Sequence, residues 1–201
     1  MTSSEKGTAR MSTHTKTLLT AVLGAVAMVA AVAAMQADAH PNGVHGSAKA
    51  TLHDAAGNEV GTVRFLPQGH DKVAVRATAS LLPAGFHGFH IHAVGLCEAP
   101  FTSAGGHYNP GSVGHGGHVG DMPVLFVQRN GESWAEFETD AFTIDELLDL
   151  NGSAVIVHAA ADNYANIPTR YSSASGPGPG AATLSTGDAG ARIACGVVER
   201  S

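Results

Sequence analysis

The near absence of helical periodicity after residue 40 is the feature that most limits the fold of this 201-residue chain. Short stretches rich in Val, Ala, Thr and Phe alternate with segments rich in Gly, Pro and Asn. In residues 62–65, Thr-Val-Arg-Phe, polar and apolar side chains alternate, which is typical of a strand with one solvated face. This pattern predicts strands at 60–66, 73–79, 124–127, 133–138, 154–158 and 192–199.

Turn and cap signals lie between these strands. Asn130-Gly131 predicts a tight hairpin turn. Residues 143–146 have the Thr-x-x-Glu pattern of a capping box, so we expect one short helix there, with an apolar side formed by Leu147, Leu148 and Leu150. Two long connections, 93–122 and 159–191, have the length of functional loops. Many short strands joined in this way predict an antiparallel sandwich or barrel.

The first 39 residues have the pattern of a secretory signal peptide. Positive residues precede an uncharged apolar run at 18–35, and Ala37-Asp38-Ala39 provides a cleavage site. A membrane anchor is the alternative, because the run is near the minimum length of a span. The cleavage site favours a signal peptide at 1–39 and one domain at 40–201, with Met11 as an alternative start. We expect an exported protein, either released or retained in the cell envelope, with no membrane segment in its mature form.

Residues 40–201 are acidic, with 8 Lys or Arg against 15 Asp or Glu. They contain no basic stripe, which argues against a nucleic-acid partner. No subunit surface can be identified, so monomer and homodimer both stay open. Cys97 and Cys195 are the chain's two cysteines, and exported domains usually pair such residues. A disulfide is therefore favoured over two buried thiols.

Eleven of the twelve histidines follow residue 39, and their clustering indicates a metal site. His90 and His92 are two residues apart, so on a strand both imidazoles point to the same side. Imidazole suits copper, zinc, iron and nickel. His158 ends an apolar strand and, taken alone, fits a packed core residue better than a ligand.

A Gly-rich segment adds four further potential ligands within fifteen residues: His107, His115, His118 and Asp121. Three histidines and one carboxylate are suited to a tetrahedral zinc ion. Glycine allows the backbone to fold closely around an ion, so the grouping favours a metal loop over a flexible polar one.

Five blocks resemble, in order, the signature blocks of the copper/zinc superoxide dismutases: 85–92, 103–110, 118–121, 155–158 and 187–196. The resemblance extends over essentially all of residues 45–198. It implies an all-β fold, a Greek-key antiparallel β-barrel or sandwich with long metal-binding and electrostatic loops and one short helix.

The resemblance also implies roles for individual residues. Asp162 matches an outer carboxylate that links a copper histidine to a zinc histidine, and Cys97 and Cys195 match the intrasubunit disulfide. Arg192 matches the cation at the mouth of the copper channel. The implied copper ligands are His90, His92, His107 and His158, and the implied zinc ligands are His107, His115, His118 and Asp121.

The activity that the resemblance implies is dismutation of superoxide to dioxygen and hydrogen peroxide, by a redox-cycling copper bridged through His107 to zinc. His107 and Arg192 are the expected catalytic side chains. A cation in a cleft attracts an anionic substrate even to an acidic protein, an effect for which superoxide dismutase is itself the known example. The alternative is a non-catalytic secreted module of the same fold that binds or buffers copper.

The spacing of two zinc-type histidines departs from the family. Only Gly116 and Gly117 separate His115 from His118, whereas the family usually spaces the corresponding residues more widely. A Gly-Gly pair turns sharply, so we expect a closed four-ligand zinc site rather than a copper-only protein.

Overall fold

Strand β3 (Lys72–Ala79) shows why this sequence forms sheets. In the computed structural model, which describes residues 46–201, Val73, Val75 and Ala77 are buried, and Arg76 between them is exposed. One face of the strand therefore packs into the core, and Arg76 on the other face points into solvent. The other strands are β1 (Ala48–Asp54), β2 (Glu59–Gln68), β4 (Gly85–His87), β5 (Phe89–His92), β6 (Leu125–Val127), β7 (Ser133–Thr139), β8 (Ala154–His158), β9 (Ser172–Ser173), β10 (Gly176–Pro177) and β11 (Arg192–Arg200).

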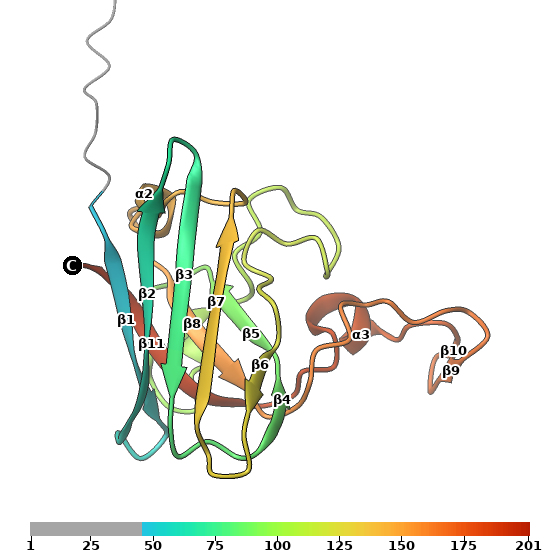
Figure 1. Cartoon of the computed structure of the whole chain (residues 1–201). Coiled ribbons are helices and arrows are strands. Elements are labelled where there is room, and N and C mark those ends of the chain that lie inside the picture. Colours follow the sequence, from blue (N-terminus) through green and yellow to red (C-terminus); the bar gives the residue numbers. More distant parts are fainter. Residues whose placement is uncertain (1–45) are drawn as a thin grey trace, which may run out of the picture. The chain divides into compact units, whose positions relative to one another are not determined.

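Seven strands form one curled antiparallel sheet in the order β5-β8-β11-β1-β2-β3-β7 (Figure 1). A two-stranded ribbon, β4–β6, connects its two ends, because β4 precedes β5 with only Gly88 between them and β6 leads into β7. The Ser133 hydroxyl on β7 donates to the Phe126 carbonyl on β6 at 2.7 Å. Strands far apart in the chain are neighbours, and the prediction of an antiparallel β-barrel is confirmed.

The barrel interior contains the apolar face of nearly every long strand. Phe65 is fully buried there and packs edge-on against Phe142, with 6.1 Å between ring centroids. Val155 and Val157 of β8 point into this core. Burial of these side chains provides the main driving force for closing the sheet.

The opposite face of β8 is also buried. Ala154 and Ile156 belong to a second, smaller apolar cluster with Phe101, Ala104 and Cys195. The 93–122 loop, with its 3-10 helix η1 (Thr102–Ala104), therefore covers the outer side of the sheet at β8 and β11. Cys97 and Cys195 form a disulfide that fixes this loop to β11, as predicted.

The predicted strands and the hairpin turn at Asn130-Gly131 are present. The strand prediction missed β1, β4, β5, β9 and β10. Helix α2 (Ile144–Leu147) has the predicted capping box, but it ends earlier than expected, and Leu150 is fully exposed rather than part of an apolar side. A second helix, α3 (Ala181–Thr186), lies in the 159–191 loop, where one helix in total was expected. The sequence analysis missed this helix because its N-cap is Gly180, which has no side chain that could form a capping hydrogen bond.

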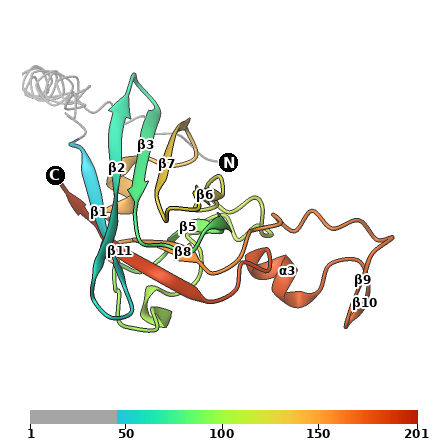
Figure 2. The same cartoon turned by 60° about the horizontal axis from the view of Figure 1, so that its bottom comes forward.

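The 159–191 loop also contains the β9–β10 hairpin, which stands away from the sheet in both views (Figures 1 and 2). Within residues 46–201, no helix is long and apolar enough to cross a membrane. The predicted signal peptide at 1–39 lies outside the described residues.

The disulfide closes a loop of 98 residues, so its removal is a direct test of how the 93–122 loop is held. We expect Cys97→Ser to lower the free energy of unfolding by about 4 to 5 kcal/mol, because the unfolded chain regains loop entropy. Denaturant unfolding of the metal-free protein measures this change. Reduced wild type should match the variant, and a variant as stable as the oxidised protein would contradict the prediction.

Candidate metal centre

The histidines of β5 and β8 lie on the outer face of the sheet, under the 93–122 loop. His90 pairs with Ile156 and His92 with Ala154, so both imidazoles share the face of the smaller apolar cluster. His158 follows Ile156 by two residues and points to the same side. His158 is buried, as a core residue would be, and it belongs to a group of four histidines.

The 93–122 loop runs alongside the free edge of β5. Short antiparallel bridges join His92 to His107 and His90 to Asp121. The Ile91 amide donates to Gly120 at 2.9 Å, and its carbonyl accepts from Tyr108 at 2.8 Å. This pairing places residues 107 and 121 beside the two strand histidines.

Four imidazoles meet in a first group, with one ring nitrogen of each within 4.8 Å of the others: His90, His92, His107 and His158. All four rings are buried. One nitrogen of each ring has no hydrogen-bond partner, namely His90 Nδ1 and Nε2 of His92, His107 and His158. Buried polar atoms are nearly always paired, so four unpaired nitrogens facing one another fit a metal with imidazole ligands.

The second nitrogen of each strand histidine is held by a partner. His92 Nδ1 donates to the Gly105 carbonyl at 2.9 Å, and His158 Nδ1 donates to the Gly190 carbonyl at 3.0 Å. His90 Nε2 donates to Asp162 Oδ2 at 2.6 Å. These bonds fix the tautomers and leave the unpaired nitrogens as lone-pair donors.

A second group contains His107, His115, His118 and Asp121. Its shortest separations include 2.9 Å from His107 Nδ1 to Asp121 Oδ1 and 3.3 Å from His118 Nδ1 to His107 Nδ1. His115 Nδ1 lies 3.3 Å from Asp121 Oδ2. Ligands about 2.0–2.1 Å from a tetrahedral zinc ion would be about 3.3 Å apart, so this donor set fits zinc.

The short His115–His118 connection does not prevent this grouping. Gly116 has φ +84°, a left-handed conformation that favours glycine, and its amide donates to Asp121 Oδ2 at 2.8 Å. The His118 amide donates to the same oxygen at 3.1 Å. The Asp121 carboxylate thus holds the turn between His115 and His118 through the amides of Gly116 and His118.

Asp162 connects the two groups. Its Oδ2 accepts from His90 at 2.6 Å, and its Oδ1 accepts from His115 at 2.8 Å. Both side chains of each pair are fully buried. The arrangement is that of a carboxylate orienting one histidine from each group.

Burial favours the neutral form of four histidines in the two groups. Desolvation lowers the pKa of His92 to about 2 and that of His158 to about 3, and it also lowers the pKa of His90 and His118. For Asp121, burial raises the pKa, but the hydrogen bond from His107 and the nearby His115 outweigh it and lower the pKa to about 2. Neutral imidazoles and an ionised carboxylate are the states that bind metal.

Arg192 lies beside the first group, opposite His158 on the β11–β8 ladder. Its guanidinium donates to the carbonyls of Phe101 and Gly105, and Gly105 also accepts from His92. Its positive charge contributes to the low pKa of His92 and His158, after burial. It also lines a surface pocket with Pro100, Thr102, Gly190 and Ala191.

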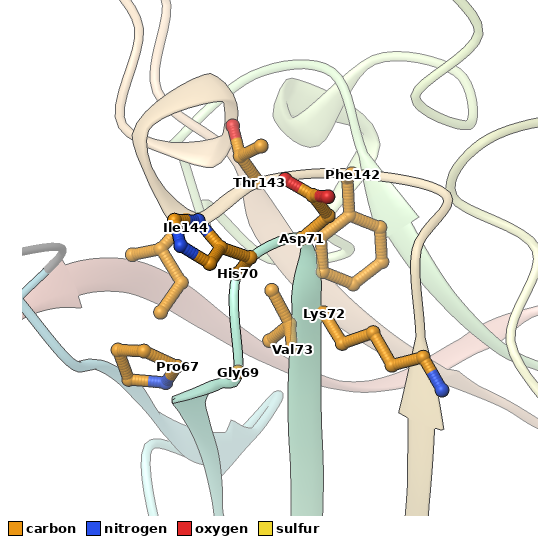
Figure 3. A pocket seen from close by; sticks show the side chains of 9 residues that line it. All are labelled: Pro67, Gly69, His70, Asp71, Lys72, Val73, Phe142, Thr143 and Ile144. Carbon is orange, nitrogen blue, oxygen red and sulfur yellow. The ribbon is translucent and has the colours of Figure 1, made fainter. Parts of the chain in front are cut away.

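Two other features lie outside both groups. Buried His87 belongs to the same sequence block as His90, but its ring nitrogens contact the carbonyls of Pro83 and His158. A small pocket between the β2–β3 turn and the start of α2 is lined by both apolar side chains, such as Phe142 and Ile144, and polar ones, such as His70 and Asp71 (Figure 3). Its lining includes no residue of either metal group.

Comparison with known proteins identifies the family. Residues 59–198 match the family model described as copper/zinc superoxide dismutase (SODC). The chain belongs to the copper/zinc superoxide dismutase family. A superoxide dismutase [Cu-Zn] from Mycolicibacterium paratuberculosis is 46% identical over 158 residues, covering 71% of this chain and 69% of the relative. An extracellular superoxide dismutase [Cu-Zn] from Onchocerca volvulus is 33% identical over 174 residues, covering 79% and 80%.

Solved structures agree with this superoxide dismutase fold. The superposition with the clock protein EA4 has a TM-score of 0.65 at 28% identity, and it covers 81% of this chain and 99% of the EA4 chain. A SOD-like protein from Bacillus subtilis has a TM-score of 0.58 at 30% identity, with coverages of 74% and 96%. The expected curled antiparallel architecture is therefore shared with known members of the fold.

The sequence analysis of this family member missed the residues that act through their backbone. The carbonyls of Gly105 and Gly190 fix the rings of His92 and His158, and every residue type offers such a carbonyl. Gly187 was also missed. A Cβ atom there would overlap the Asp162 carboxylate, and its φ is +61°. Only the folded path of the 159–191 loop, which brings Gly187 against Asp162, reveals this requirement.

Gly187 offers a test of the Asp162 bridge. We expect Gly187→Ala to lower the affinity for both metals by about 10- to 100-fold, because the new methyl group displaces the carboxylate. Metal content after dialysis against a chelator measures the loss. Gly69→Ala is the matched control, since Gly69 has φ +65° and open space around it. Equal metal retention in the two variants would contradict the prediction.

The lowered histidine pKa values predict acid sensitivity of the metal-free protein. Below pH 6.5, His92 and His158 become protonated in the unfolded chain. In the folded chain they stay neutral until the pH nears their lowered pKa values, about 2 for His92 and about 3 for His158. The free energy of unfolding should therefore fall with pH by about 1.4 kcal/mol per unit for each histidine. Denaturant titrations between pH 7.5 and 4.5 measure this slope, and a flat profile would argue against it.

Proposed function

We propose that this protein is an enzyme that converts superoxide into dioxygen and hydrogen peroxide. The observation that supports this most strongly is the first group, in which four buried ring nitrogens face one another without hydrogen-bond partners. We assign copper to His90, His92, His107 and His158, and zinc to His107, His115, His118 and Asp121. When bound there, copper supplies the one-electron redox couple and zinc holds the loop.

His107 is the proposed proton carrier. Each turnover consumes two superoxide anions and two protons and yields one dioxygen and one hydrogen peroxide. His107 directs Nδ1 toward the second group and leaves Nε2 unpaired on the side of the first. Its Nε2 can therefore hold a proton beside the substrate in one half of the cycle and donate it in the other.

Arg192 is the proposed attractor of superoxide. Arg192 lines a surface pocket, and its positive charge contributes, after burial, to the low pKa of His92 and His158. The formal net charge of the whole chain is −6, so an anion needs a local positive field to approach. The two backbone carbonyls that accept from Arg192 keep the cation beside the histidines.

A non-catalytic copper-binding module is the second candidate. Copper storage requires ligands, but it requires neither a histidine shared between two groups nor a cation beside the ligands. Both are present, as His107 belongs to both groups and Arg192 adjoins the first. These two features favour the enzyme.

Superoxide decay tests the activity. The metal-loaded wild type should react at about 10⁸–10⁹ M⁻¹ s⁻¹, the ceiling for diffusion-limited enzymes. His158→Ala should lose copper and nearly all activity. Tight copper binding with slow turnover in the wild type would instead select the copper-binding module.

Arg192→Ala separates substrate attraction from copper binding in the same assay. It should keep copper, capture superoxide more slowly, and show a weaker dependence of rate on ionic strength. Arg192→Lys is the control, because it keeps the charge and should restore the salt dependence. An unchanged salt dependence in Arg192→Ala would exclude the attracting role.

We further propose that the protein is exported and that residues 1–39 are its signal peptide. The Cys97–Cys195 disulfide supports this, because such bonds persist in oxidising compartments. Mass spectrometry of the exported protein should find His40 as the first residue. An exported chain that keeps its leader would show that the segment is an anchor.

A further inference from the structure

Tyr164 is a residue of the 159–191 loop that neither the sequence motifs nor the proposed mechanism uses. It follows Asp162 by two residues. Its phenol oxygen accepts from the Val124 amide at 2.7 Å and donates to the Met122 carbonyl at 3.2 Å. Met122 directly follows Asp121, so one side chain connects the loop of Asp162 to the segment of Asp121.

The backbone of Tyr164 contacts the same two regions. Its amide donates to Asp162 Oδ1 at 2.7 Å, the oxygen that also accepts from His115. Its carbonyl lies against Gly116, where a Cβ atom would overlap it. Tyr164 therefore touches the bridging carboxylate on one side and the His115–His118 turn on the other.

The backbone conformation at this position requires such support. Tyr164 and Ala165 both have φ +55°, a left-handed conformation that costs free energy for any residue with a Cβ atom. Two such residues in succession persist only where surrounding contacts hold them. The two phenol hydrogen bonds are contacts of this kind.

We propose that Tyr164 is a positioning residue that locks the Asp162 loop onto the zinc turn. Through its phenol it holds the left-handed segment, and through its amide it holds the Asp162 carboxylate in line with His115. Its effect on zinc therefore passes through Asp162. This inference rests on the assignment of zinc to the second group.

The test uses the full metal-loaded protein and measures the rate at which a chelator removes Zn²⁺. Tyr164→Phe deletes one hydroxyl and keeps the ring. Because a hydrogen bond of this kind has a net value of about 1 kcal/mol, zinc release should become about 3- to 10-fold faster. Tyr171→Phe is the matched control, since Tyr171 is exposed and its ring lies against the guanidinium of Arg170 in a cation–π contact. It should release zinc at the wild-type rate.

A double-mutant cycle with Asp162→Asn tests whether Tyr164 acts through the carboxylate. In the Asp162→Asn background, Tyr164→Phe should add less than about 2-fold to the release rate, because contacting residues in one network are non-additive. With Co²⁺ in place of zinc, the visible absorption of wild type and Tyr171→Phe should coincide, and that of Tyr164→Phe should shift. A purely stabilising tyrosine would leave this spectrum unchanged.

Three results would overturn the inference: wild-type zinc release in Tyr164→Phe, an unchanged Co²⁺ spectrum in that variant, or a full, additive acceleration in the Asp162→Asn background. Failure of the zinc assignment would look different, because the wild type itself would then retain neither Zn²⁺ nor Co²⁺.

Discussion

The carboxylate of Asp162 accepts a hydrogen bond from His90 and another from His115, and the rest of the site depends on this pair of contacts. Each bond uses one nitrogen of its imidazole and leaves Nδ1 of the same ring without a hydrogen-bond partner. Because the two histidines belong to different groups, one carboxylate sets the orientation of both. Gly187 and Tyr164 matter because they define where that carboxylate lies.

The barrel provides the rigid part of this arrangement. Strands β5 and β8 are buried on both faces, with apolar residues inside and histidines outside, and the disulfide holds the 93–122 loop over the outer face. Burial suppresses protonation of these histidines. The fold thus keeps unpaired imidazoles together at a cost in stability, and metal binding at these nitrogens would offset that cost.

Sequence reasoning predicted the parts that have a local pattern. Alternation identified β2 and β3, the Thr143–Glu146 capping box identified α2, and family resemblance brought together the histidines of both groups. It did not predict the carbonyl partners of His92 and His158 or the phenol contacts of Tyr164. These contacts depend on how the two long loops fold against the strands and against each other, and no residue type or spacing in one segment encodes the position of the other.

The central proposal is that His107 is shared between a copper site and a zinc site on the outer face of the barrel. Anomalous diffraction from crystals of the metal-loaded protein, recorded at the copper and zinc absorption edges, tests it most directly. We predict one copper peak among His90, His92, His107 and His158, and one zinc peak among His107, His115, His118 and Asp121. A single metal peak, or a copper peak outside the first group, would contradict the account.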